Sequence, residues 1–146
     1  MSFLPHARFD ALPAELAAAR DALVPFIGER AVTLFAYAIA DESDALVTSV
    51  YFRRVLVDSG EDPHEPQVTE AEQLLVDWGR SIARTPFTHG DGLSDRVEAA
   101  FSEPLRLLLV TFAAQLIAAI VFANVAQVPL DESLYPYRRT GDTRTR

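Results

Sequence analysis

Cysteine is absent from this sequence of 146 residues, and so is lysine. The absence of cysteine excludes disulfides, thiolate nucleophiles, thiolate metal ligands and any cysteine-based redox cycle within the chain. All 13 basic residues are arginines, and 21 acidic residues outnumber them to give a formal net charge of -8. This excess repels phosphate backbones, and no basic stripe lies outside the short C-terminal stretch. We therefore expect no nucleic-acid partner.

The N-terminus, MSFLPHARFD, lacks the basic stretch and the following apolar run of a secretory signal, so we predict a cytoplasmic protein. One apolar run, Leu107 to Ala123, is about as long as the shortest membrane-spanning helices. It contains Gln115 near its middle and many alanines, and no basic anchor follows it closely. We interpret this run as a core or interface helix and expect no membrane association.

The composition is that of one folded domain spanning residues 1–146, with 49% apolar and 23% charged residues. Apolar residues recur with a period near 3.6, and no alternation of period 2 reaches the length of a strand. The sequence therefore predicts an all-α fold, a compact bundle of about six helices.

The six helices are delimited by prolines, glycines and capping residues. The first predicted helix runs from Pro13 to the stretch VPFIG at 24–28, the second from about Glu29 to Ala40, and the third lies within 41–63. The fourth begins at a capping box formed by Thr69 and Glu72, and the fifth runs from Ser94 to Phe101. The sixth begins at Ser102 and Pro104 and ends at the stretch VPLDE at 128–132. Residues 133–146 lack periodicity and are expected to form a mobile tail unless a neighbouring subunit holds them.

The fourth predicted helix carries one apolar stripe with the spacing i, i+3, i+4, i+7 and i+11. The stripe consists of Ala71, Leu74, Leu75, Trp78 and Ile82. On the opposite, solvated face Asp77 and Arg80 are spaced to form an ion pair. The position of Trp78 in the stripe predicts a core residue and not a platform for a ligand.

Two stretches resemble the carboxymuconolactone decarboxylase and alkylhydroperoxidase D-like family of small all-helical proteins. YFRRVLVDSGEDP, at 51–63, is similar to the helix that follows the family's redox motif and ends in (A/S)G(x)(D/E). Residues 101–132 resemble the family's final helix, which ends in AN(x)(x)(x)V(x)LD. The matching residues are Ala123, Asn124, Val128, Leu130 and Asp131.

With the helix order between these stretches, the resemblance covers roughly residues 29–132. It implies an alkylhydroperoxidase D-like fold that assembles through helical faces. Members of this family usually form dimers, trimers or hexamers, so we expect a homo-oligomer. The apolar sixth predicted helix is suited to such an interface.

In redox-active members of the family the corresponding helix opens with CxxCxxxH, whose three reactive side chains share one helix face. Counting back from Gly60 places the two cysteine positions at Ala45 and Thr48 and the histidine position at Phe52. The family's proton-relay glutamate falls near Thr33. All four reactive groups are missing, and a hydroxyl does not replace a thiolate nucleophile. We therefore expect no thiol peroxidase or disulfide reductase activity.

A shift of one or two residues in that count would bring an acidic residue near the relay position, but no shift supplies a cysteine. The acidic candidates are Asp41, Glu42 and Asp44.

A residual pocket at the vacated redox site is one interpretation of six polar side chains. These are Thr33, Thr48, Ser49, Tyr51, Arg53 and Arg54. An arginine there could bind a small carboxylated ligand through its planar fork. The favoured alternative is that Thr48 and Ser49 fill space and that Arg54 pairs with Asp58 one turn later. Arg53 and Arg54 point about 100° apart, so at most one of them faces any given pocket.

The three histidines, His6, His64 and His89, lie far apart in loops and lack the HxxxH or HExxH spacing of a metal site. We therefore expect no metal and no cofactor.

The leading functional hypothesis is a redox-inactive member of this family with a binding or structural role. The alternative is a decarboxylase or related lyase that acts on a small carboxylated metabolite without cysteine. An arginine would hold the carboxylate there, and Asp, Glu or Tyr would move protons. A peroxidase-related description would rest on family inheritance alone. The enzyme needs an accessible polar pocket beside Thr48, whereas the structural role expects Ala45, Thr48 and Phe52 to be packed closed.

Overall fold

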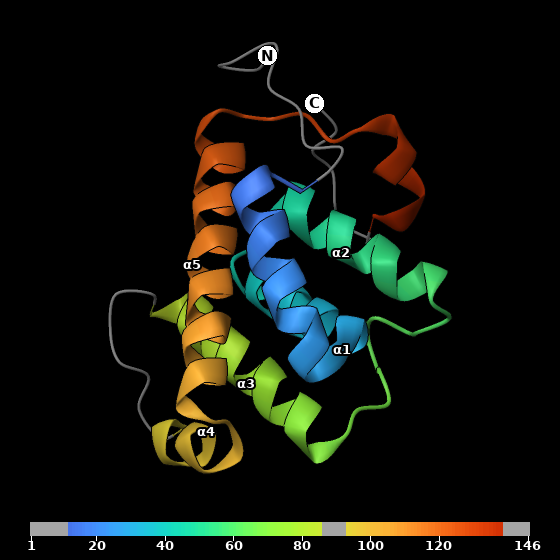
Figure 1. Ribbon diagram of the computed structural model, residues 1–146. Coiled ribbons are helices and arrows are strands. Elements are labelled where there is room, and N and C mark those ends of the chain that lie inside the picture. Colours follow the sequence, from blue (N-terminus) through green and yellow to red (C-terminus); the bar gives the residue numbers. More distant parts are fainter. Residues whose placement is uncertain (1–11, 86–92, 139–146) are drawn as a thin grey trace.

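The computed structural model describes residues 12–85 and 93–138, and every regular element in these ranges is a helix (Figure 1). The elements are α1 (Ala14–Glu42), α2 (Leu46–Asp58), α3 (Glu70–Arg84), α4 (Ser94–Ala100), α5 (Glu103–Val125) and the short 3-10 helix η1 (Glu132–Tyr137). The predicted all-α bundle is confirmed.

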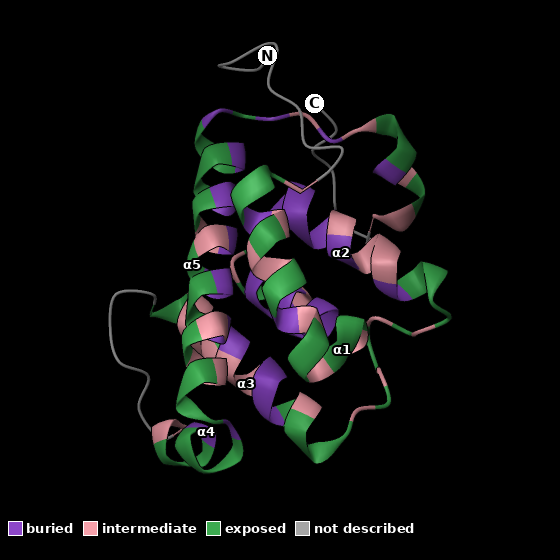
Figure 2. Cartoon of the chain, viewed as in Figure 1, coloured by how far each residue is buried: buried purple, intermediate pink, exposed green. Residues whose placement is uncertain are grey.

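Helix α1 is the central element, because it packs against α2, α3 and α5 (Figure 1). Its second half is buried nearly all round, and Phe35 there lies 5.9 Å from Trp78 of α3 and 6.1 Å from Phe112 of α5, measured between ring centroids. In Figure 2 the buried residues of α5 face α1, and its exposed residues lie on the opposite side. One side of α5 therefore forms core while the other is open.

The first two predicted helices form one element with a kink. Gly28 has φ 85° and ψ 159°, a conformation that is essentially restricted to glycine, and Pro25 lacks the amide that would continue the helical hydrogen bonds. The predicted break at 24–28 is therefore present, but helix continues directly on both sides of it. The third predicted helix begins later than its acidic residues indicated, because α1 extends to Glu42 and α2 starts at Leu46.

The predicted caps of α3 and α5 are confirmed. Thr69 Oγ1 accepts a hydrogen bond from the backbone N–H of Glu72 at 3.2 Å, and Glu72 Oε1 accepts one from the backbone N–H of Thr69 at 2.8 Å. Ser102 Oγ caps α5 by accepting from the backbone N–H of Leu105 at 3.3 Å. In the α3 stripe Ala71 is exposed, so the buried face starts one turn later than predicted.

The prediction of a mobile tail is wrong for residues 133–138. Leu134 of η1 is buried in a cluster with Leu46, Val50 and Leu130, and Tyr137 Oη donates a hydrogen bond to Asp58 Oδ1 at 2.8 Å. A single buried leucine with flanking tyrosines gives no helical period, which is why the sequence pattern did not reveal this element. Residues 139–146 lie outside the described residues.

Candidate functional site

The positions that match the family's redox motif are sealed inside the bundle. The exposed fraction is 2% for Ala45, 0% for Thr48 and 2% for Phe52. The Thr48 hydroxyl is directed at the carbonyl oxygen of Ala45 at 3.5 Å, which is too long for a strong hydrogen bond. Ser49 is also buried, and its hydroxyl donates to the carbonyl oxygen of Leu46 at 3.1 Å. A substrate therefore has no access to Ala45, Thr48 or Ser49 in this conformation.

A cavity of about 320 Å³ lies next to the sealed positions and brings together Thr33 and Tyr51 of the predicted pocket. Its lining consists of Leu12, Ala17, Arg20, Asp21, Thr33, Tyr51, Phe52 and Val55. Arg20 is paired with Asp21 at 3.4 Å and lies 3.6 Å from a carboxylate oxygen of Glu29. The positive charge at this cavity is therefore already balanced.

Arg53 and Arg54 have different surroundings, as their angular offset on α2 predicts. Arg54 lies over the ring of Tyr51, with its Cζ 4.9 Å from the ring centroid. The predicted Arg54 partner, Asp58, instead accepts the hydrogen bond from Tyr137. Of the six predicted pocket residues, Thr33 and Tyr51 line one cavity and Arg54 lies over Tyr51, whereas Arg53 contacts other residues.

Arg53 forms a hydrogen-bonded group with two residues that the sequence did not single out together. Its Nη1 donates to Tyr37 Oη at 3.0 Å, and its Nη2 lies 3.0 Å from His64 Nε2. Because a guanidinium only donates, this contact requires Nε2 to be the accepting nitrogen, as in the tautomer that carries its proton on Nδ1. Arg53 thereby selects one tautomer of His64.

His64 and Tyr37 line a cleft of about 140 Å³, which we call the α1/α3 cleft. Its lining consists of Leu34, Tyr37, Ala38, Asp41, Pro63, His64, Pro66, Val76 and Arg80. These residues come from α1, from α3 and from the loop that joins α2 to α3. No sequence motif links them, because they are brought together only when α1 packs against α3.

Arg80 does not form the predicted ion pair with Asp77. Asp77 accepts a hydrogen bond from Gln73 Nε2 at 2.9 Å instead. Arg80 is exposed at the α1/α3 cleft, and it forms no ion pair with any other residue of the described ranges. The cleft therefore contains a cation without a carboxylate partner among those residues.

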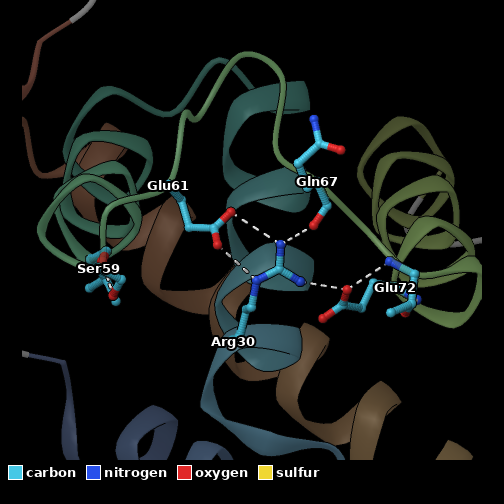
Figure 3. A network of polar contacts seen from close by, with 7 residues as sticks. Arg30, Ser59, Glu61, Gln67 and Glu72 are labelled. Atoms are coloured by element: carbon cyan, nitrogen blue, oxygen red, sulfur yellow. Dashed lines mark hydrogen bonds and ion pairs between the residues drawn. The ribbon is translucent and has the colours of Figure 1, made fainter.

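The loop that carries His64 is held by Arg30 of α1 (Figure 3). Arg30 Nε and Nη2 each donate to Glu61 at 3.1 Å, Nη1 donates to Glu72, and Nη2 also donates to the carbonyl oxygen of Gln67. Figure 3 shows the guanidinium between these three groups. Because four of its five N–H groups are occupied by protein acceptors, we assign Arg30 a structural role.

The Arg30 network changes the ionisation of its members. The hydrogen bond from Arg30 lowers the pKa of Glu61. Burial raises the pKa of Glu72, but hydrogen bonds from Arg30 and from Thr69 outweigh it and lower that pKa overall. Hydrogen bonds to Glu61 and Glu72 raise the pKa of Arg30 above its ordinary value. The network is therefore fully charged at neutral pH.

Within the described ranges, no group of three or more side chains is arranged to hold a metal ion. His6 and His89 lie outside those ranges.

Comparison with known proteins adds no match: no protein-family model, curated protein or solved structure is significantly similar to this chain. The resemblance to the carboxymuconolactone decarboxylase-like family therefore stands on the sequence motifs alone.

Proposed function

We propose that this chain is a carboxymuconolactone decarboxylase-like protein without thiol chemistry that has a binding or structural role as a cytoplasmic homo-oligomer. The observation that carries this proposal is the apolar outer face of α5. Its members are Leu107, Val110, Val121, Phe122 and Val125, whose exposed fractions lie between 49% and 69%.

The outer face of α5 is one continuous stripe. At 100° per residue its five large side chains fall within about 120° of the helix circumference. Between them the stripe passes over the small exposed residues Thr111, Ala114 and Ala118. No charged residue occurs from 107 to 130. A large uncharged face of this kind marks an interaction site in a soluble protein.

A second copy of the chain suits this face because large residues lie at both ends of the stripe and small ones in its middle. In an antiparallel two-fold pairing, Leu107 of one copy would meet Val121 and Val125 of the other. The helices could approach closely where Ala114 and Ala118 cross. The same patch would then serve both copies, as an isologous interface requires.

A membrane is the competing partner for α5. Two described helices, α1 and α5, are long and apolar enough to cross a membrane. Of the most apolar 18-residue segment of each, 50% is buried inside the domain in α1 and 33% in α5. However, Leu109, Phe112 and Leu116 of α5 are fully buried against the rest of the bundle. Surrounding α5 with lipid would require this core to open.

Light scattering on the purified chain tests the proposal, since one copy has a mass of 16.1 kDa. We expect a multiple of this mass at micromolar concentration, and a monomer for Val121→Glu because the charge would be buried without a partner. Asn124→Glu is the matched control, because this exposed residue of α5 lies outside the stripe. A wild-type monomer, or an equal effect of both variants, would overturn the proposal.

A lyase on a small carboxylated metabolite is the second candidate, and the 320 Å³ cavity is the observation that favours it. Arg20, Asp21 and Tyr51 line this cavity and supply a cation, a carboxylate and a phenol. The test is release of CO2 from a panel of small carboxylates and carboxylated lactones, repeated with Tyr51→Phe. Turnover by the wild type that falls at least tenfold in the variant would support the lyase. Absence of turnover across the panel would support a binding or structural role.

A further inference from the structure

We propose that the α1/α3 cleft binds a small monocarboxylate, with Arg80 and His64 as the groups that contact the carboxylate. Arg53 acts as a positioning residue behind His64. This site lies away from the outer face of α5 and does not depend on self-association. It also differs from the sealed redox-motif positions on α2.

The first argument is the distribution of charge. Three other arginines each pair with carboxylates: Arg20 with Asp21 and Glu29, Arg30 with Glu61 and Glu72, and Arg84 with Glu42. The other six arginines of the described ranges form no ion pair there, and of these Arg80 alone lines the α1/α3 cleft.

Arg80 lines the cleft, and Arg53 contacts two residues that line it. Arg80 forms no ion pair within the described ranges, and Arg53 there contacts only the neutral groups of Tyr37 and His64. Asp41 also lines the cleft, and Asp62 accepts a hydrogen bond from the backbone of His64. The guanidinium of Arg80 favours a negative charge on the ligand.

The second argument is the fixed tautomer of His64. Since Nε2 accepts from Arg53, the imidazole carries its proton on Nδ1 and has one N–H to donate to a ligand. Arg80 supplies a planar guanidinium, whose geometry matches the two oxygens of a carboxylate. An exposed histidine would otherwise exchange between tautomers, so the contact with Arg53 prepares the donor in advance.

The loop that carries His64 is also held in place. The backbone N–H of His64 donates to Asp62 Oδ1 at 2.9 Å. On either side of His64, Arg30 binds Glu61 and the carbonyl oxygen of Gln67. Pro63 and Pro66 restrict the backbone further. The position of His64 is therefore set by the fold before a ligand binds.

The third argument is the size and lining of the cleft. The cleft has a volume of about 140 Å³, which is sufficient for a small ligand. Leu34, Ala38 and Val76 form the apolar wall of the cleft. An inorganic phosphate would leave this wall without contacts, whereas a carboxylate with a short aliphatic chain would cover it.

The experiment is an NMR titration of the 15N-labelled chain with butyrate, with butyramide as a neutral ligand of the same size and phosphate as an alternative oxyanion. Ionic strength is held constant with sodium chloride. We expect butyrate to shift the amide signals of residues at the cleft, and butyramide and phosphate to bind at least tenfold more weakly.

Arg80→Gln and Arg84→Gln form a matched pair, since both residues are exposed on α3 one turn apart. Arg80→Gln should weaken butyrate binding about tenfold or more, the loss expected for a hydrogen bond to a charged group, and Arg84→Gln should leave it unchanged. Arg53→Gln should weaken binding and also release the Nδ1–H tautomer, which the ring 15N signals of His64 report directly.

Three results would overturn the proposal: no butyrate-dependent shifts at the cleft, equal binding of phosphate and butyrate, or equal loss of binding in the Arg80→Gln and Arg84→Gln variants. Light scattering on the same samples shows whether the oligomer is intact. Failure of self-association and failure of the carboxylate site can therefore be told apart.

Discussion

Gly79 of α3 lies so close to Phe35 of α1 that a Cβ added to the glycine would come within 3.1 Å of the Phe35 carbonyl oxygen. The same atom would lie 3.2 Å from Cγ1 of Ile39 and 3.3 Å from Cβ of Ala38. The two helices therefore meet where α3 has no side chain. This close approach brings Arg80, the next residue of α3, to the cleft beside α1.

Substitution of Gly79 should show how tightly this contact is packed. Alanine gains up to about 1 kcal/mol of helix propensity, and the close contacts oppose that gain, so Gly79→Ala should change the free energy of unfolding by less than about 1 kcal/mol. Gly79→Leu should lower it by about 3 kcal/mol or more, because the larger side chain must separate α1 from α3. Urea denaturation measures both changes. A leucine variant as stable as the wild type would show that the helices separate without cost.

Local signals predicted the fold well, because the residues that carry them act on their immediate neighbours. Thr69 and Glu72 cap α3 as their spacing requires, and Gly28 breaks α1 where only glycine tolerates the backbone. Element η1 was missed because its stability comes from Leu134 in a distant apolar cluster and not from a local period.

The α1/α3 cleft lay beyond sequence-based prediction for a related physical reason. Tyr37, His64 and Arg80 are separated by long stretches of chain, and only the packing of α1 against α3 brings them together. Composition did reveal what the protein lacks. The absence of cysteine alone excludes thiol chemistry in this chain.

The Arg30 network should make stability depend on pH in the acidic range. The pKa values of Glu61 and Glu72 are lower in the folded chain than in the unfolded chain. Their contribution to the free energy of unfolding is therefore present above the pKa of the unfolded chain, and it is lost as the pH falls through the pKa of the folded chain. Arg30→Gln should lower the free energy of unfolding at pH 7 by about 1 kcal/mol. The difference from the wild type should shrink as the pH falls from about 5 to about 3.

Urea denaturation at a series of pH values from 7 to 3 measures this effect. Arg80→Gln is the control, because Arg80 forms no ion pair within the described ranges and its substitution should give a difference that does not vary with pH in this way. A difference between Arg30→Gln and the wild type that stays constant down to pH 3 would contradict the assigned role of the network.

The C-terminal element η1 should contribute to global stability. Leu134 has 1% of its surface exposed and packs with Leu46, Val50 and Leu130, so Leu134→Ala should lower the free energy of unfolding by about 2–5 kcal/mol. Val57→Ala, at a residue of α2 that is 41% exposed, should cost much less. Thermal unfolding followed by circular dichroism compares the two. Similar small changes in both variants would mean that η1 detaches without affecting the domain.

A cysteine in place of Thr48, which matches a cysteine position of the family that the sequence resembles, should be unreactive while the chain is folded. Thr48 has no exposed surface, and cysteine behaves as a small apolar residue, so Thr48→Cys should fold but react with a thiol reagent only when the chain opens. Ser59→Cys, at an exposed residue just after α2, should react at once.

The rates of thiol labelling with and without urea distinguish these cases, and a peroxide assay on Thr48→Cys should give no turnover. Rapid labelling of the native Thr48→Cys chain would show that the start of α2 opens readily, and the lyase hypothesis would then gain an accessible site. Slow labelling with the rate of global unfolding would instead mean that a sulfur at this position is not sufficient for thiol chemistry. The site lacks access and an imidazole at Phe52 as well as a thiol.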